Sequence, residues 1–194
     1  MRHTLIATTL ALTAVAASLS GCFPIIAGGM GTGVMMADDR RTSGIYIEDE
    51  RIELKVETLT GPSKLGDKVH VNAVSFNRVL LITGEVPDEA TKAKVGKIAA
   101  DVDNVKRVQN ELSIGRPSTL GERSNDVYLT TRVKTRFLSE GKKRFNANHV
   151  KVFTESGVVY LMGLVSKDEG AAAAEIAAGT PGVKRVVKVF EYTE

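Results

Sequence analysis

The chain of 194 residues has one cysteine, no tryptophan and only 5% aromatic residues. A single cysteine excludes an intrachain disulfide, so stability has to come from apolar cores, which the 43% hydrophobic content permits. Because aromatic side chains are scarce, a stacking platform for single-stranded nucleic acid is not expected, and we predict no nucleic-acid partner. After residue 21 no apolar run approaches the length of a membrane span, so we expect the rest of the chain to fold outside the bilayer.

The one long apolar run lies at the N-terminus. Residues 5–19 follow Arg2 and His3, and this run is too short for a spanning helix but typical of a signal peptide. The next residues, Leu-Ser-Gly-Cys at 19–22, resemble a bacterial lipobox, which implies cleavage before Cys22 and acylation of its thiol and its new amine. Three acyl chains exceed the two signals that stable anchoring needs, so the attachment would be permanent. The alternative is an ordinary cleaved signal followed by a stray cysteine.

Two segments of the chain are copies of one another. His70 and Gly84 in the first copy match His149 and Gly163 in the second, 79 residues further on (149 − 70). The motif Val-Lys-Arg-Val at 105–108 recurs at 183–186, at almost the same interval. Each copy spans about 70 residues, the size of a small domain.

The second copy shows the order of elements most clearly. Leu129, Val133 and Phe137 recur every fourth residue and predict one face of a helix. Residues 150–152 and 158–162 predict two strands joined as a hairpin. The N-cap of the helix is left open between three candidates, Ser124, Asn125 and Asp126.

A second helix and a third strand follow the hairpin. Ser166 and Glu169 form a capping box that opens an alanine-rich helix, which Gly179 and Pro181 end, and residues 186–192 predict the last strand. Each copy therefore has the order α-β-β-α-β. We predict an α+β fold in which each copy has a three-stranded mixed sheet with two helices packed on one face. Gly84 and Gly163 end the second strands and predict a bulge or the close packing of a helix.

This duplicated pattern, with its two terminal glycines, resembles the BON domain family over roughly residues 48–192. A lipobox ahead of two such domains, together with the stretches 120–126 and 159–165, resembles the dual BON-domain lipoproteins of the Gram-negative outer membrane. The expected organisation is a signal peptide at 1–21, a lipidated flexible tether at 22–47, BON domains at 48–114 and 124–194, and a linker at 115–123.

The resemblance implies a non-enzymatic role. It implies binding of anionic phospholipid, phosphatidylglycerol or cardiolipin, through the second domain, and support of outer-membrane integrity. Phe23 rather than Asp follows Cys22, which by the usual sorting rule favours the outer membrane. The chain would then be anchored on the periplasmic face, and enrichment at the division site is also implied.

The first helix of the second copy is the predicted membrane-binding surface. Tyr128 lies opposite the arc of Leu129 and Val133, and an exposed aromatic side chain among cations suits an interfacial helix. The residues predicted to bind phospholipid are Val127, Tyr128, Thr131, Arg132, Thr135 and Arg136, and Lys142, Lys143 and Arg144 follow them. In the alternative, Tyr128 packs against the first copy and the basic residues form a solvated face.

Charge separates the two copies. Residues 48–114 contain 10 basic and 12 acidic residues, whereas residues 123–194 contain 12 basic and 8 acidic residues. The second copy is therefore the one expected to meet an anionic partner. The acidic first copy is the natural docking face in the alternative function, an adaptor for outer-membrane assembly or peptidoglycan remodelling machinery.

Other candidate sites are weaker. His70 and His149 occupy matched positions in separate copies with no accompanying Cys or Asp/Glu constellation, so we predict no metal site. The glycine-rich stretch 28–33 lacks the Lys-Ser/Thr pair and the preceding strand of a phosphate-binding loop. No nucleophile or acid–base pair has a recognisable context, so we predict neither enzyme activity nor a cofactor.

Overall fold

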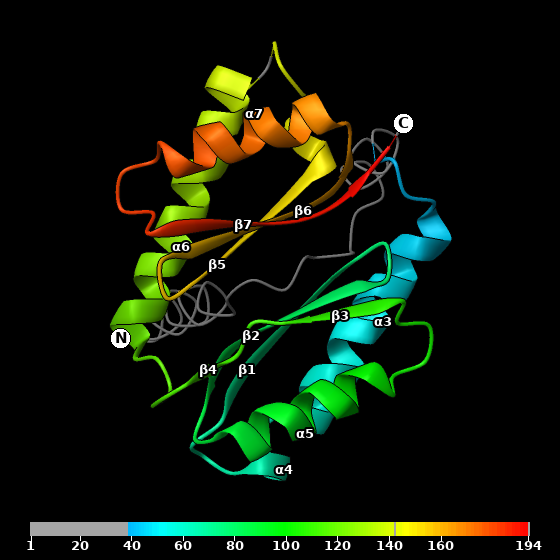
Figure 1. The fold of residues 1–194 in the computed structure, drawn as a ribbon, viewed down its shortest axis with the longest axis vertical. Helices are drawn as coiled ribbons and strands as arrows, with labels where there is room; N and C mark the ends of the chain where they lie inside the picture. The colour runs from blue at the N-terminus through cyan, green and yellow to red at the C-terminus, as the bar shows by residue number, and fades with distance from the viewer. Residues whose placement is uncertain (1–38, 142, 194) are drawn as a thin grey trace, which may run out of the picture. The chain divides into compact units, whose positions relative to one another are not determined.

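A computed structural model describes residues 39–141 and 143–193, in which each copy forms a small α+β domain (Figure 1). The first domain contains α3 (Ser43–Thr60), α4 (Pro62–Leu65), β1 (His70–Phe76), β2 (Val79–Val86), α5 (Glu89–Ala100), β3 (Arg107–Asn110) and β4 (Ser113–Ile114). The second contains α6 (Leu120–Arg136), the π-helical turn η1 (Phe137–Gly141), the 3-10 turn η2 (Ala147–His149), β5 (Val150–Glu155), β6 (Val158–Val165), α7 (Lys167–Ala178) and β7 (Arg185–Tyr192).

Several sequence predictions lie outside the described residues. They are the signal peptide, Cys22, the tether as far as residue 38, and Lys142. Within the described ranges, no helix combines the length and the apolar character needed to cross a bilayer.

The two sheets have the same topology. In each domain the first two strands are antiparallel and the third is parallel to the second, so the predicted α-β-β-α-β order and the mixed sheets are confirmed. The registers also agree, because Val71 pairs with Gly84 in the first sheet and Val150 pairs with Gly163 in the second. The two-residue strand β4 extends the first sheet and pairs with β2.

The two repeated glycines allow neighbouring strands to approach closely. A Cβ atom at Gly84 would run into the carbonyl oxygen of His70, and one at Gly163 into that of His149. Gly84 also has a φ of 115°, which side chains rarely permit. The close neighbour of each glycine is therefore the backbone at the start of the adjacent strand: His70 begins β1, and His149 directly precedes β5.

The first helix of each domain begins earlier than its periodicity indicates. The N-cap of α3 is Thr42, so residues 43–47 are helical although they were expected to belong to the tether. The N-cap of α6 is Thr119, which forms a capping box with Glu122, so the predicted caps at 124–126 are wrong. The capping box of Ser166 and Glu169 at α7 is confirmed.

Each domain has a core between its helices and one face of its sheet. In the first domain this core includes Ile52, Val56, Leu80, Ile82, Val95 and Ala99. In the second it includes Val133, Phe137, Val159, Leu161, Ala173 and Ile176. Small and branched side chains at helical and strand spacing account for both cores.

The opposite faces of the two sheets pack against each other. Their side chains form one buried cluster of Val74, Phe76, Val79, Leu81, Tyr160, Met162 and Val189. Since successive residues of a strand point to opposite faces, Leu80 enters the helical core while Leu81 enters this shared cluster. All eight residues of β2 are buried for this reason.

Polar contacts surround the shared cluster. The Nζ of Lys151 lies 2.7 Å from Glu53 Oε1, and the Nδ2 of Asn77 donates to Glu191 Oε2 at 2.7 Å. Just before α3, Arg40 donates to the carbonyl of Leu164 at 2.8 Å and pairs with the carboxylate of Glu169. The sequence left the packing of the domains open, and these contacts show that it is specific.

Candidate functional site

The predicted phospholipid-binding residues lie on the face of α6 that points away from the core. Val127 is 67% exposed and Tyr128 is 57% exposed, whereas Leu129 and Val133 on the opposite face are buried. The exposure of Tyr128 excludes the alternative in which its ring packs against the first domain. Thr131 and Thr135 are exposed as well, while Arg132 and Arg136 are half-buried at the edge.

Two further apolar residues extend this surface beyond the prediction. Leu120 is 82% exposed at the start of α6, and Leu138 is 65% exposed in η1. At about 100° per residue, Leu120, Val127 and Thr131 fall within about 40° of one line along the helix. We call the exposed set the α6 stripe: Leu120, Val127, Tyr128, Thr131, Thr135 and Leu138.

The two threonines of the α6 stripe have satisfied hydroxyl groups. Thr131 donates its hydroxyl to the carbonyl of Val127 at 2.9 Å, and Thr135 donates to that of Thr131 at 2.9 Å. A hydroxyl that is already hydrogen-bonded within the helix costs less to move out of water. The stripe is therefore less polar than its composition indicates.

The arginines beside the stripe differ in how far they are engaged. The Cζ of Arg132 lies 5.5 Å from the centre of the Tyr128 ring, and its Nη1 donates to the carbonyl of Pro181 at 3.2 Å. Arg136 instead forms a bidentate pair with Glu140 at 2.7 and 2.8 Å and also donates to the carbonyl of Ile176. This pairing lowers the pKa of Glu140, so the charge of Arg136 is compensated within the domain.

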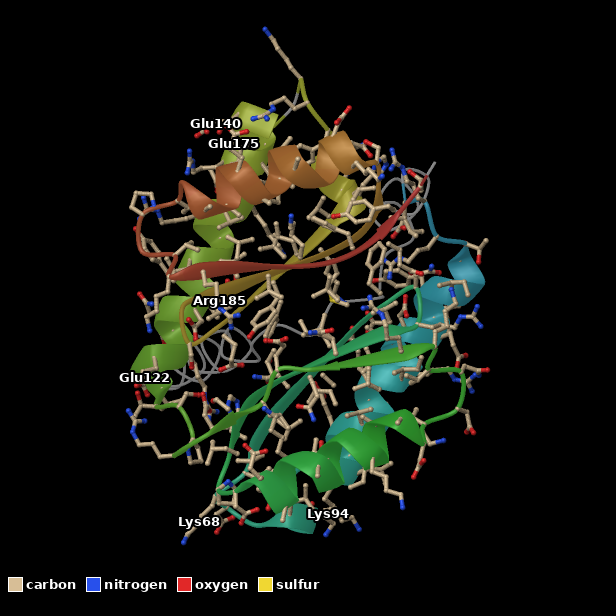
Figure 2. The ribbon with its side chains drawn as sticks, viewed as in Figure 1. Lys68, Lys94, Glu122, Glu140, Glu175 and Arg185 are labelled. Atoms are coloured by element: carbon tan, nitrogen blue, oxygen red, sulfur yellow. The ribbon has the colours of Figure 1, made fainter. Side chains whose placement is uncertain are left out.

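Further cations lie along and beyond the helix. Arg144, in the loop after η1, pairs with Glu175 of α7 at 2.7 Å, and Figure 2 labels Glu175 and Glu140 at the same end of the second domain. Lys134 and Lys143 are exposed, and within residues 39–141 and 143–193 neither has an ion-pair partner. Arg132, Lys134 and Lys143 are thus three cations beside the stripe whose charge no carboxylate within the described ranges balances.

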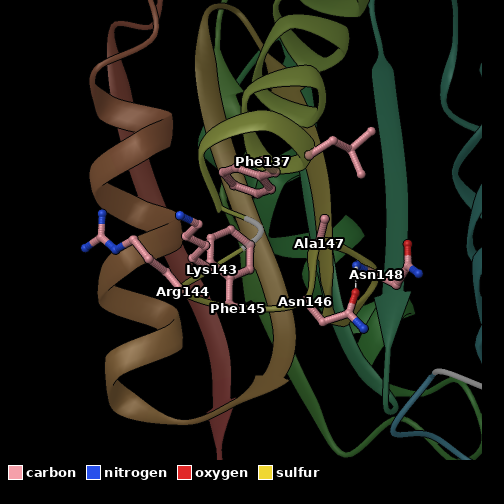
Figure 3. A pocket seen from close by; sticks show the side chains of 8 residues that line it. Phe137, Lys143, Arg144, Phe145, Asn146, Ala147 and Asn148 are labelled. Atoms are coloured by element: carbon pink, nitrogen blue, oxygen red, sulfur yellow. Dashed lines mark hydrogen bonds between the residues drawn. The ribbon is translucent and has the colours of Figure 1, made fainter.

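A cavity of about 540 Å³ lies where η1 meets the loop that leads to β5 (Figure 3). Phe137 and Phe145 form an apolar wall, with their rings edge to face and their centres 5.0 Å apart. Leu138, Lys143 and Arg144 also line the cavity. The cavity joins apolar and basic groups at the end of the α6 stripe, the combination that an amphiphilic anion requires.

The equivalent helix of the first domain has the opposite charge. Residues 43–60 of α3 contain five acidic and two basic residues, while residues 120–136 of α6 contain two acidic and four basic ones. Partial burial, together with Glu53 and Glu50, raises the pKa of Glu57 on α3. The two helices occupy equivalent places in the fold, yet only α6 suits an anionic partner.

One buried group of ionisable residues was not predicted from the sequence. His70 lies beside Glu85 and Glu155, so the expectation that no acidic residues accompany this histidine is wrong. Glu85 faces His70 across the β1–β2 hairpin, and Glu155 comes from the second domain. His149 is not part of this group. The register of the β1–β2 hairpin could have predicted that His70 lies opposite Glu85. The approach of Glu155 depends on how the two domains pack.

The family model of the BON domain matches residues 48–116 and again residues 125–194. The chain belongs to the BON domain family. Two matches in one chain agree with the duplicated fold and the common strand registers described above. The two sheets and the helices that cover them are therefore BON domains.

This BON protein is similar to several characterised chains. It is 38% identical to the outer membrane lipoprotein DolP of Haemophilus influenzae over 177 residues, which cover 91% of each chain. It is 32% identical to a 21 kDa hemolysin of Actinobacillus pleuropneumoniae over 80% of each chain. It is 26% identical to the osmotically-inducible protein Y of Escherichia coli, over 74% of this chain and 72% of that one.

Proposed function

We propose that this BON protein is a non-enzymatic, lipid-anchored protein of the outer membrane that binds anionic phospholipid through the α6 stripe. The observation that carries the proposal is the exposed apolar stripe of α6 beside uncompensated cations. The likeness to an outer membrane lipoprotein over 91% of the chain supports the location. Cys22, within its lipobox, would carry the anchor on the periplasmic face.

The chemistry of the stripe suits the headgroup region of a bilayer. Leu120, Val127 and Leu138 supply apolar side chains, and Tyr128 has an apolar ring with a polar tip. Each cation near an anionic surface contributes about 1 kcal/mol, so Arg132, Lys134 and Lys143 together contribute about 3 kcal/mol. Such a contact is reversible, and it would hold a protein that is already anchored in a defined orientation.

The ring of Tyr128 and the guanidinium of Arg132 act as one unit in this proposal. Because the guanidinium lies against the ring, insertion of the ring carries the cation to the depth of the lipid phosphates. The cavity at Phe137 and Phe145 adds an apolar recess at the other end of the stripe. Binding of phosphatidylglycerol or cardiolipin, support of outer-membrane integrity and enrichment at the division site belong to the same proposal.

An adaptor role is the second candidate, and one observation favours it. Ile47 and Leu54 on α3 are 56% and 66% exposed among acidic side chains. An apolar patch within an acidic helix would be repelled by anionic lipid but suits a basic protein partner. This surface would serve outer-membrane assembly or peptidoglycan remodelling machinery.

Vesicle binding separates the two candidates. The protein without acyl chains, residues 23–194, is mixed with vesicles of phosphatidylglycerol in phosphatidylcholine or of phosphatidylcholine alone, and binding is measured by co-sedimentation. We expect binding to the anionic vesicles only, and at least a tenfold loss in a Tyr128→Ala, Leu138→Ser variant. The control is Leu54→Ser, which removes an equally exposed leucine from α3 and should bind as the unaltered protein does.

Two results with the unaltered protein would count against the lipid proposal. One is equal binding to both kinds of vesicle, because the basic side chains would then contribute nothing. The other is the absence of binding to either, which would direct attention to protein partners of α3. A loss caused by Leu54→Ser alone would assign the lipid contact to the first domain.

A further inference from the structure

A histidine and two glutamates meet at the junction of the two BON domains. His70 begins β1 and Glu85 lies opposite it on β2, while Glu155 ends β5 of the second domain. One potential ligand atom from each residue lies within 4.8 Å of the other two. Glu85 and Glu155 are each only 6% exposed.

The contacts hold these side chains in place. The Nδ1 of His70 lies 3.0 Å from Glu85 Oε2, and the Nδ2 of Asn72 donates to Glu155 Oε2 at 2.6 Å. Glu85 also accepts hydrogen bonds from the backbone N–H of Ser118 at 2.9 Å and from the hydroxyl of Ser156 at 3.1 Å. Outer-shell hydrogen bonds of this kind orient carboxylates toward a common point.

Within residues 39–141 and 143–193, no lysine or arginine forms an ion pair with Glu85 or Glu155, although the charge of Arg116 acts on Glu85. Two buried carboxylates face one imidazole, and the neighbouring Asp126 adds a third negative charge to the field at Glu155. Arg123 reaches the hydroxyl of Ser118 rather than either glutamate of the group. Burial of two carboxylates side by side is costly unless a cation accompanies them.

The repeat shows that neither glutamate is required by the BON fold. With the 79-residue offset, Glu85 corresponds to Leu164 in the second domain, and Glu155 corresponds to Phe76 in the first. Phe76 is buried and Leu164 is partly buried, and both pack in or against the apolar cluster between the sheets. Each carboxylate therefore occupies a position at which the other copy has an apolar side chain. This difference favours a role for the two carboxylates in binding a ligand.

We propose that His70, Glu85 and Glu155 bind a divalent transition-metal ion of the zinc type and that this ion joins the two domains. One imidazole nitrogen and two carboxylate oxygens are ligands that zinc accepts, and the imidazole disfavours calcium and magnesium. Two ligand atoms that each lie about 2.1 Å from a tetrahedral zinc ion are about 3.4 Å apart. Small side-chain movements would therefore bring the ligand atoms of the three residues, now within 4.8 Å of one another, to this distance. Three protein ligands leave a further position for water.

This proposal does not depend on lipid binding, because the site and the α6 stripe share no residue. The ion would link two ligands of the first domain to one of the second, so its binding energy would add to the stability of the domain junction. Zinc should therefore raise the midpoint of thermal unfolding in a concentration-dependent way.

The test is a calorimetric titration of the mature, acylated protein with zinc chloride. The protein carries no histidine tag, is held in phosphatidylcholine nanodiscs at neutral pH, and is first treated with a chelator. We expect one zinc ion per chain and no saturable binding in His70→Ala. Glu155→Gln should bind at least tenfold more weakly, because one of three protein ligands is lost.

Two control variants test whether a loss of zinc binding is specific to the proposed ligands. His149→Ala removes the histidine at the equivalent position of the second copy, and Glu175→Gln removes an exposed glutamate, so both should bind as the unaltered protein does. If His70→Ala fails to fold by circular dichroism, the absorption spectrum of the cobalt-loaded unaltered protein and of His70→Gln decides instead. The proposal is overturned if no stoichiometric zinc binding occurs, or if binding survives the loss of His70.

Discussion

Asp49 and Asp126, from the first helix of each domain, hold equivalent hairpin turns. The carboxylate of Asp126 accepts hydrogen bonds from the backbone N–H groups of Ser156 and Gly157, both at 2.8 Å. That of Asp49 accepts the corresponding bonds from Asn77 and Arg78 at 2.8 and 2.7 Å. All four turn residues have positive φ, as a tight two-residue hairpin requires. Each aspartate therefore ties a helix to the hairpin that it covers.

Replacement of Asp126 by alanine should destabilise the protein. Asp126 is only 5% exposed, and its loss leaves two backbone donors without their partner. We expect the free energy of unfolding to fall by about 3 kcal/mol, measured by urea denaturation. Asp67→Ala, at an exposed loop position, is the control and should change it by less than about 0.5 kcal/mol. Equal effects of the two substitutions would refute this role for Asp126.

Two glycine-to-alanine substitutions should have opposite effects. A Cβ at Gly163 meets the carbonyl of His149, so Gly163→Ala should lower the free energy of unfolding by about 2 kcal/mol. At Gly121, in the first turn of α6, a Cβ would have Thr119 Oγ1 at 4.0 Å as its nearest neighbour apart from the adjoining residues and the helix backbone. Gly121→Ala should therefore raise it by about 0.5 kcal/mol, since alanine is the better helix former. Thermal unfolding of both variants checks the sign of each effect.

The capping box of α6 should persist in acid. Arg116 and the backbone and hydroxyl of Thr119 donate to Glu122, and these bonds lower the pKa of Glu122 to about 2 from its ordinary 4.5. Because the pKa in the folded state is depressed, this contribution to stability is present above pH 4.5 and is lost as the pH falls through about 2. Carbon NMR of the Glu122 carboxyl follows the titration. In Arg116→Gln the pKa should return toward 4.5, and an unchanged value would show that Arg116 has no part in it.

Tyr160 should report on the contact between the two sheets. Its side chain is 3% exposed within the shared cluster, and burial raises its pKa to about 12 from 10.0. The neutral phenol is thus favoured in the folded state, so this contribution to stability is present below pH 10 and is lost as the pH rises through about 12. The difference in tyrosinate absorbance between the unaltered protein and Tyr160→Phe isolates this titration. A pKa near 10 would mean that the sheet faces are not in contact.

Much of the fold is predictable because it is encoded locally. The helical spacing of Leu129, Val133 and Phe137 and the capping box at Ser166 correctly predict α6 and α7. The predicted N-terminus of α6 is wrong because the three candidate caps, Asp126 among them, are of residue types that are common at N-caps. In the structure this aspartate caps a hairpin instead, and the true cap, Thr119, lies in a segment whose composition indicates a linker.

The features of the candidate sites differ in how far the sequence can predict them. The exposure of Tyr128 follows from helix geometry, and the prediction of its orientation agrees with the structure. The approach of Glu155 to His70 and Glu85 could not be predicted in the same way, because it depends on how one domain packs on the other. Leu138 was not predicted as part of this surface, although a period of about 100° per residue places it in line with Leu120.

The shared cluster between the sheets makes the two BON domains resemble the subunits of a dimer that have been joined into one chain. Each sheet contributes apolar side chains that it cannot cover by itself, such as Phe76 from one and Met162 from the other. A single domain separated from its partner would expose this face and would self-associate through it. Covalent linkage fixes the ratio of the two halves at one to one, so one half can carry a basic helix while its counterpart carries an acidic one.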